Sequence, residues 1–349
     1  MTLFSKNLKY YRLKKSLTKK ELAALCGVSP MAITHYENEG RFPGMEIMKR
    51  LADALHVRVT DFLVSRNQNL SFCHNEFRKG SALGSEKQEL VRESAEEYFS
   101  RYMTVVEILG SDVLPPAPLC HAIDVSGDAE IDASALRRHL NFSPEGPLEE
   151  LTAQLENKGF LIYEMDLDDR RFSGMNGTVN GRPYMTVNSR MSPERKRSTL
   201  VHELAHLMFR WDSVKMTEKA IENHATAIAG AFLLPCKDLQ LELGPRRTLL
   251  SYDMVNVAKE YGVSVQLLLK RANVCGILND ASYRNNCVLI SRLGWRSNEP
   301  SRVTEEAPMM FSQFVYRAIA EKDISVQKGA ELLQIPYETV AQNCWVHED

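Results

Sequence analysis

The run His202-Glu203-Leu204-Ala205-His206 places two histidines four residues apart with a glutamate between them. Residues i and i+4 lie on the same face of a helix, so both imidazoles can reach one metal ion. The glutamate is close enough to polarise a metal-bound water without being a ligand itself. The pattern therefore predicts a zinc-binding helix in which Glu203 is the catalytic carboxylate.

The residues around the motif favour a helix. Ser192, Pro193 and Glu194 are typical of an N-cap, a first helical position and an acidic first turn. An apolar stripe can bury one face of the helix, formed by Leu200, Leu204, Leu207 and Met208. We therefore expect a helix that begins near Pro193 and carries both histidines.

A catalytic zinc needs a third protein ligand and leaves its fourth position to water. The next expected helix runs over residues 217–234 and is stopped by Pro235, with Glu222 and His224 near its beginning. Its packing face contains small and apolar residues, Ala225, Ala229, Phe232 and Leu233. Glu222 is the preferred third ligand and His224 the alternative. The non-catalytic interpretation is a buried helix pair with hydrogen-bonded histidines.

Residues 172–235 resemble the zinc peptidase domain of the ImmA/IrrE family. The shared elements are Ser173-Gly174, the strand Tyr184–Asn188, Arg195 and Arg197, the H-E-x-x-H motif, and the segment from Glu222-Asn223-His224-Ala225 to Leu233-Leu234-Pro235. Two positions depart from the family. Thr226 stands where Asn or Asp is common, and Ser198 where an aromatic residue is usual.

The resemblance implies a thermolysin-like mechanism. His202, His206 and Glu222 would hold the zinc, and Glu203 would take a proton from the attacking water and return it to the leaving amine. The strand of residues 184–188 precedes the motif helix. As an exposed sheet edge it could bind a substrate backbone through Tyr184, Thr186 and Asn188. A core strand is the alternative interpretation.

The N-terminal 66 residues are basic. They hold twelve Lys and Arg against six Asp and Glu, whereas the whole chain has a net charge of −2. Thr18 is a candidate N-cap for a helix that closes at Gly27, and a second short helix follows over residues 30–38, with Ile33 and Tyr36 facing inward. A basic helix-turn-helix at one end of the chain predicts a contact with a polyanion.

Residues 3–64 resemble the Xre/Cro-type repressor family, including Glu37, Pro43, the helix of residues 51–57 and Phe62-Leu63. In that family the helix after the turn lies in the major groove. The resemblance implies double-stranded DNA contacts from Lys19, Lys20, Ser29, Met31, Ala32, Thr34 and His35. Lys19 replaces a frequent Gln, and Glu39 stands where the turn glycine is usual. A protein-docking module is the alternative to DNA binding.

One such domain contacts few bases, so we expect a homodimer on a two-fold operator. The rest of the chain is mainly α with a small β-sheet (α+β). We expect a helix-turn-helix domain, a linker with a long helix at residues 86–109, a zincin-like metallopeptidase domain and a helical C-terminal region with a short strand at residues 288–290. The boundaries are 1–66, 67–118, 119–245 and 246–349.

The lead-in to the motif also resembles fused Xre–ImmA/IrrE proteins, with short helices expected at residues 133–139 and 147–158 and a strand at 160–164. Two further helix-turn-helix-like patterns, at residues 255–271 and 325–337, are interpreted as interhelical packing, because neither is strongly basic. The seven scattered cysteines contain no C-x-x-C pair and are expected to be reduced.

The chain has neither a signal peptide nor an apolar run long enough to cross a bilayer, so we expect a cytoplasmic protein of bacterial or phage type with no membrane partner. The favoured hypothesis is a transcription regulator with a zinc endopeptidase domain. It would cleave a protein partner or itself in a stress, phage or toxin–antitoxin response. The alternatives are a non-proteolytic repressor or antitoxin whose metallopeptidase fold is a sensor, and a peptidase that uses its helix-turn-helix only for docking.

Overall fold

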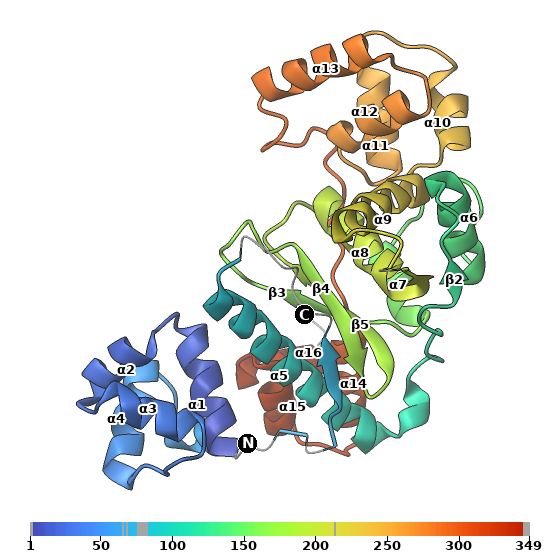
Figure 1. Cartoon of the computed structure of the whole chain (residues 1–349). Helices are drawn as coiled ribbons and strands as arrows, with labels where there is room; N and C mark the ends of the chain where they lie inside the picture. The colour runs from blue at the N-terminus through green and yellow to red at the C-terminus, as the bar shows by residue number, and fades with distance from the viewer. Residues whose placement is uncertain (1–2, 65, 68, 75–82, 213, 345–349) are drawn as a thin grey trace. The chain divides into compact units, whose positions relative to one another are not determined.

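Helices form most of the chain, and a small mixed sheet accompanies them (Figure 1), which confirms the expected fold class. The computed structural model describes residues 3–64, 66–67, 69–74, 83–212 and 214–344. The chain divides into two compact units. The first consists of Met1–Phe72, Glu76–Ser111 and Phe314–Asp349, and the second of Cys73–Asn75 and Asp112–Gln313. This division separates the end of the expected C-terminal region from its beginning.

The first unit opens with the helices of the expected helix-turn-helix. Their bounds are α1 Leu3–Lys14, α2 Lys19–Cys26, α3 Pro30–Glu37 and α4 Met45–Leu55, followed by the 3-10 helix η1 Val59–Leu63. Thr18 and Glu21 form a capping box at the start of α2, and Gly27 ends that helix at φ +63°. Ser29 caps α3 by accepting a hydrogen bond from the backbone N–H of Ala32. These local signals therefore place the turn between α2 and α3.

A buried ion pair joins the first and third helices. The guanidinium of Arg12 donates through Nε to Glu37 Oε1 at 2.5 Å and through Nη2 to Oε2 at 3.1 Å. Both side chains are buried, and Ile33 and Tyr36 are buried beside them, as the sequence predicts. Glu39 takes a left-handed conformation at φ +66°, so the turn keeps this conformation without the usual glycine.

The remainder of the first unit surrounds the long helix α5, Ser85–Leu109, which confirms the helix expected at residues 86–109. Helix α1 contacts α5 through the ion pairs Lys6–Glu96 at 2.8 Å and Lys9–Glu89 at 2.6 Å. The last helices of the chain are α14 Met310–Ala320, α15 Val326–Leu333 and α16 Tyr337–Cys344. Arg101 of α5 donates to the carbonyl oxygen of Leu332, so α15 packs against the long helix.

The second unit contains the mixed sheet, in the order β1-β4-β5-β3. The strand bounds are β1 Phe72–His74, β3 Leu161–Met165, β4 Gly174–Val179 and β5 Arg182–Asn188. Strand β5 pairs in parallel with β3 and antiparallel with β4. The expectation that residues 184–188 form an exposed edge is therefore wrong. Tyr184, Thr186 and Asn188 lie buried in an interior strand whose backbone is already paired on both sides.

Short elements precede and flank this sheet. They are the 3-10 helix η2 Ser111–Val113, the helices α6 Ala129–His139 and α7 Leu151–Asn157, and the parallel pair β2 Ile123–Asp124 and β6 Phe209–Arg210. The helices and strand expected over residues 133–164 are thus present, with their bounds shifted by up to four residues. Buried apolar side chains of α6 and α7 join the main core.

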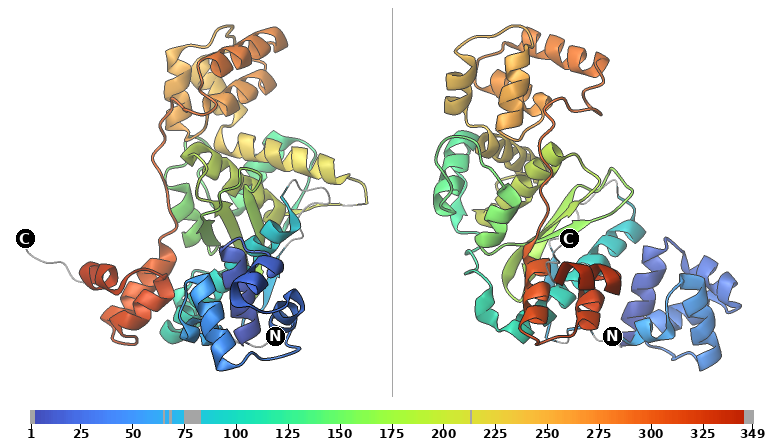
Figure 2. Two further views of the ribbon diagram at one scale, coloured as in Figure 1. Left: turned by 90° about the vertical axis from the view of Figure 1, so that its left-hand side faces the viewer. Right: turned by 180° about the vertical axis from the view of Figure 1, so that it is seen from behind.

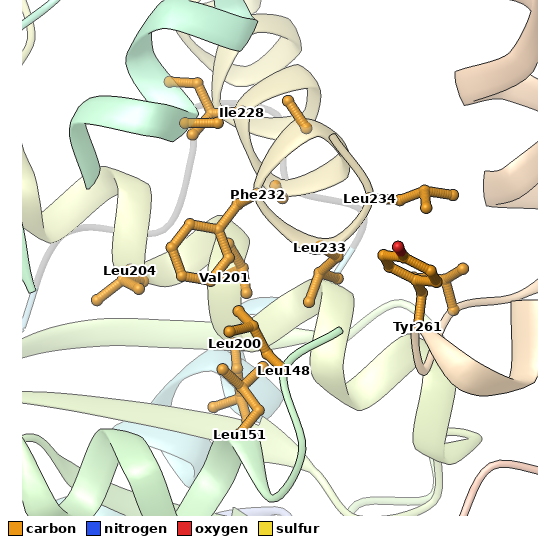
Figure 3. Packing of buried hydrophobic residues seen from close by; sticks show 14 of the residues in the cluster. Leu148, Leu151, Leu200, Val201, Leu204, Ile228, Phe232, Leu233, Leu234 and Tyr261 are labelled. Carbon is orange, nitrogen blue, oxygen red and sulfur yellow. The ribbon is translucent and has the colours of Figure 1, made fainter. Parts of the chain in front are cut away.

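Helix α8, Pro193–Met208, contacts β4 and β5 on one side and α9, Glu218–Leu233, on another (Figures 1 and 2). Thr217 caps α9 by accepting from the N–H of Ala220, and the helix ends before Pro235, as expected. Figure 3 shows Phe232 of α9 close to Val201 of α8 within the apolar cluster. A buried phenylalanine of this kind stabilises a fold by about 3–5 kcal/mol relative to alanine.

Four helices follow α9 in the second unit: α10 Cys236–Leu243, α11 Tyr252–Glu260, α12 Val265–Val274 and α13 Asp280–Arg292. The strand expected at residues 288–290 is wrong, because these residues lie inside α13. The side chain of Asn279 caps that helix. Helix formation over residues 280–292 therefore prevails over the strand preference of the three apolar residues 288–290, two of which are β-branched. In the part of the chain described, no helix is long and apolar enough to cross a membrane.

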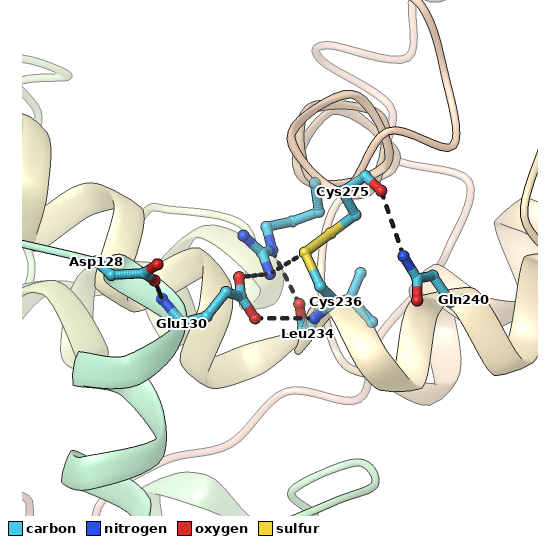
Figure 4. The surroundings of a disulfide bond; sticks show 7 residues. Asp128, Glu130, Leu234, Cys236, Gln240 and Cys275 are labelled. Carbon is cyan, nitrogen blue, oxygen red and sulfur yellow. Dashed lines mark hydrogen bonds and ion pairs between the residues drawn. A yellow bond between two sulfur atoms is a disulfide. The ribbon is translucent and has the colours of Figure 1, made fainter.

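The expectation that all seven cysteines are reduced is also wrong. Cys236, at the start of α10, and Cys275, which follows α12, form a disulfide (Figure 4). The two residues are 39 positions apart in the sequence. The packing of α10 against α12 brings their Cα atoms to 5.4 Å. Sequence spacing cannot reveal such a pair, because it depends on tertiary contact.

Candidate metal centre and nucleic-acid interface

Helices α8 and α9 bring three ligand-type side chains together. His202 Nε2 lies 3.1 Å from Glu222 Oε2, and His206 Nε2 lies 3.3 Å from Glu222 Oε1. The two Nε2 atoms are 3.2 Å apart. All three side chains are about 15 % exposed, so the cluster is accessible from one side. This arrangement could hold one metal ion, as the sequence predicts for these residues.

A neighbouring hydroxyl orients the first histidine. Thr226 Oγ1 donates to the carbonyl oxygen of Glu222 at 2.8 Å and lies 3.2 Å from His202 Nδ1. Because a hydroxyl has a single hydrogen, this second contact requires Nδ1–H of the ring to be the donor. The lone pair is then left on Nε2, the atom that faces Glu222. Thr226 therefore supplies the support that metal-binding histidines usually receive from a carboxylate or carbonyl oxygen.

Glu203 is held by strand β4. Its Oε2 accepts a hydrogen bond from Asn176 Nδ2 at 2.6 Å, and both side chains are buried. A Cβ atom on Gly174 would lie 2.8 Å from Glu203 Oε1, so only glycine leaves room for the carboxylate there. The sequence motif includes Gly174 but not Asn176, because the asparagine is 27 positions from its partner and carries no spacing signal.

His224 lies outside the cluster. Its Nε2 is 2.7 Å from Asp132 Oδ2, and Asp132 also accepts from the N–H of Ser126 at 2.9 Å. The alternative third ligand is thus engaged by a buried carboxylate on α6. The Trp211 ring lies between the two sites, with its centroid 5.8 Å from that of His206 and 6.1 Å from that of His224. Neither Asp132 nor Trp211 was anticipated from the sequence.

The other motif residues hold neighbouring segments in place. Asn188 Nδ2 donates to the carbonyl oxygens of Leu167, at 3.0 Å, and Phe172, at 3.2 Å, so it closes the loop before β4. Arg195 donates to Ser173 Oγ at 3.0 Å. Arg197 is buried and donates to the carbonyl oxygen of Gly262 at 3.1 Å. These motif residues therefore hold α8 and the segments around it.

Helix α3 presents the residues predicted to meet DNA. Ser29, Met31 and His35 are exposed, whereas Ala32 and Thr34 are partly exposed. Thr34 Oγ1 donates to the carbonyl oxygen of Pro30 at 3.1 Å, which leaves its lone pairs and methyl group for a partner. At the start of α2, Lys20 is exposed, while Lys19 Nζ lies 3.5 Å from Glu37 Oε2. Two lysines at the start of α2 and the exposed or partly exposed side chains of α3 thus lie on neighbouring helices.

Two protein-family models match the chain. A helix-turn-helix model matches residues 8–62, and the model of the IrrE N-terminal-like domain matches residues 155–273. The chain joins a helix-turn-helix domain to an IrrE-like domain. No sequence among the curated proteins matches it. The second match begins within α7 and ends one residue before the end of α12, so it covers the candidate metal centre and Cys236 but not Cys275.

Proposed function

We propose that this chain is a transcription regulator whose IrrE-like domain is a zinc-dependent endopeptidase. Its substrate is a protein partner or the chain itself, in a stress, phage or toxin–antitoxin response. The observation that carries the proposal is the convergence of His202, His206 and Glu222 beside a carboxylate, Glu203, that takes no part in the cluster. A metal site that only stabilises the fold has no use for this fourth residue.

The donor set fits zinc. Two nitrogen or oxygen ligands bound at about 2.0–2.1 Å with tetrahedral angles lie roughly 3.3 Å apart. The two histidine Nε2 atoms are 3.2 Å apart, and each faces a different oxygen of Glu222, at 3.1 Å from His202 and 3.3 Å from His206. Two histidines and one carboxylate leave the fourth position for water, the composition typical of thermolysin-like catalytic sites. Zinc there supplies Lewis-acid chemistry and makes a bound water easier to deprotonate.

Three residues of the chain have the remaining roles in catalysis. Glu203 accepts the proton of the attacking water and returns it to the leaving amine. Asn176 holds one carboxylate oxygen of Glu203, which limits the rotation of the general base. Thr226 keeps the Nε2 lone pair of His202 directed at the ligand cluster.

Replacing Glu203 with glutamine tests the proposal. Glu203→Gln should bind about one zinc per chain, like the unaltered protein, but should cleave about 10²–10⁴-fold more slowly, because the general base is lost. Metal analysis and incubation with proteins encoded by neighbouring genes measure the two effects. Glu218→Gln, an exposed carboxylate in the first turn of α9, is the matched control and should change neither. Full regulatory response in Glu203→Gln would instead support a sensor without proteolysis.

The helix-turn-helix domain supports binding to a double-stranded DNA operator. One domain with a single short reading helix contacts few bases, so we propose that two copies of the chain bind a two-fold site. Sedimentation with and without operator DNA tests this directly. Two chains per duplex are expected, and a one-to-one complex would contradict the dimer.

A further inference from the structure

The Cys236–Cys275 bond lies just beyond the C-terminal end of α9, the helix that carries Glu222. Cys236 is the first residue of α10 and follows Leu234-Pro235, where α9 ends, whereas Cys275 directly follows α12. Both cysteines are partly exposed. The disulfide therefore joins the end of α9 to the helices beyond it at an accessible position (Figure 4).

A buried arginine lies beside the sulfur of Cys236. Arg271 Nη2 is 3.5 Å from Cys236 Sγ, and its Nε donates to the carbonyl oxygen of Leu234 at 2.9 Å. Arg271 also pairs with Glu130 of α6, whose Oε2 accepts from the backbone N–H of Cys236 at 3.0 Å. After reduction, a thiolate at Cys236 would face this guanidinium and the first turn of α10, and both features favour the charged sulfur.

The same atoms could form a metal site instead. Glu130, Cys236 and Cys275 offer ligand atoms within 4.8 Å of one another. The position of Arg271 argues against this use, because its guanidinium already pairs with Glu130 and lies 3.5 Å from Cys236 Sγ, so a metal ion would have to displace it from both ligands. A cation beside a sulfur pair instead promotes attack by thiolate.

We propose that Cys236 and Cys275 form a reversible thiol–disulfide exchange site whose oxidant is a low-molecular-weight disulfide such as oxidised glutathione. The Cys236 thiolate attacks one sulfur of the small disulfide and releases the first glutathione thiolate. The Cys275 thiolate then attacks Cys236 Sγ and releases the second. The two protein thiols thus lose two electrons and two protons, and one disulfide becomes two thiols.

The redox state of this pair should affect how firmly the C-terminal end of α9 is held against α6. The disulfide links α10 to α12, and Arg271 joins both to Leu234 and to Glu130. Glu130 lies on α6 two residues before Asp132, the partner of His224 on α9. Oxidation therefore restrains the C-terminal end of α9 and its contact with α6. This inference depends only on the contacts named and stands whether or not the chain is a peptidase.

Redox titration of the full chain tests the site. The protein is equilibrated in buffers of reduced and oxidised glutathione, its free thiols are alkylated, and each cysteine peptide is quantified by mass spectrometry. Cys236 and Cys275 should oxidise together in one reversible two-electron transition. Cys73, exposed, and Cys287, partly exposed, are internal controls that should not follow it. A pair that stays reduced in every buffer, or never becomes reduced in the folded protein, overturns the proposal.

Single-thiol variants test the role of the arginine. Cys236 in Cys275→Ser should be alkylated at neutral pH about tenfold faster than Cys275 in Cys236→Ser, because the Arg271 guanidinium contacts Cys236 Sγ, whereas Cys275 meets Arg271 through backbone atoms. Adding Glu130→Gln to Cys275→Ser should raise the rate further, since it removes the competing negative charge and preserves the shape of the side chain. Equal rates in the two single-thiol variants would contradict the assignment.

Zinc titration separates this site from a metal site. The reduced full chain should bind one zinc per chain, and Cys236→Ser should leave that number unchanged. A second zinc that disappears in Cys236→Ser would show that the sulfur pair is a metal site and overturn the proposal. The readout is the difference in bound zinc between the unaltered chain and Cys236→Ser, which does not depend on whether His202, His206 and Glu222 bind zinc, so the two proposals fail independently.

Discussion

At the scale of single residues, the site depends on contacts between side chains that are distant in sequence. Glu203 is held by Asn176, and His202 is oriented by Thr226. Thr226 departs from the family pattern, yet it makes the contact that a supporting residue must make. A hydroxyl can therefore replace an amide or carboxylate here, because the imidazole needs only one acceptor at Nδ1.

Asn176→Ala should lower kcat about 10–100-fold with little change in KM, because Glu203 would keep its chemistry but lose its orientation. Steady-state kinetics with the protein substrate measure kcat and KM separately. Thr178→Ala on the same strand is the control. Equal kcat in Asn176→Ala and the unaltered chain would show that the contact is dispensable.

The buried pair of Arg12 and Glu37 predicts a large effect on stability. Glu37→Gln should destabilise the helix-turn-helix by about 3–5 kcal/mol, because it leaves the Arg12 guanidinium buried without its counter-charge. Denaturant unfolding of the full chain, followed by a probe in the first unit, measures this value. The exposed i,i+4 pair Arg50–Glu46 provides the control, and Glu46→Gln should cost less than about 1 kcal/mol.

At the scale of elements, α2 and α3 are expected to make different kinds of DNA contact. We expect Lys20, which is exposed, to contact phosphate, and Thr34 and His35 of α3 to contact base edges. Thr18 and Ser29 cap the two helices, so the residue at which each helix begins is fixed by neighbouring sequence. That starting point decides which side chains lie on the exposed face of each helix. The exposed Met31 adds an apolar side chain that suits contact with a thymine methyl group.

Lys20→Ala should weaken binding to all DNA sequences and reduce the slope of log K against log salt by about 1, because one phosphate contact is lost. Thr34→Ala and His35→Ala should instead change the preferred sequence, by about 1–3 kcal/mol at the affected base. Binding assays at several salt concentrations separate the two effects. Lys259→Ala, exposed in the second unit, should change neither. Absence of DNA retention at low salt would favour a protein-docking role for this domain.

At the scale of the whole molecule, each unit has its own apolar core, so ligands of one should act on that unit first. Zinc at about 100-fold above its Kd should stabilise the second unit by about 2.7 kcal/mol. Chelation should therefore lower its Tm, while the unfolding of the helix-turn-helix core and its DNA binding stay unchanged. Calorimetry with and without chelator measures this. A His206→Ala variant should be insensitive to zinc, and a zinc-dependent Tm in that variant would contradict the proposed ligand set.

Local signals in the sequence predict the helices that matter most. Thr18 caps α2 as expected, Ser192 stands at the N-cap position of α8 without a side-chain hydrogen bond, and α5, α8 and α9 follow their apolar periodicity. Such signals act over a few residues, because capping and i,i+4 contacts need only neighbouring chain. The spacing of His202 and His206 on one helical face has the same origin.

Tertiary structure alone decided the remaining features. The interior position of β5, the contact of His224 with Asp132, and the Cys236–Cys275 bond each join segments from different parts of the chain. The position of Asn176 beside Glu203 belongs with them. Periodicity and spacing report only which face of an element a residue occupies, whereas partner strands and side-chain neighbours depend on how whole elements pack. The sequence by itself thus determined which helices carry the ligand residues, and the fold determined which side chains surround them.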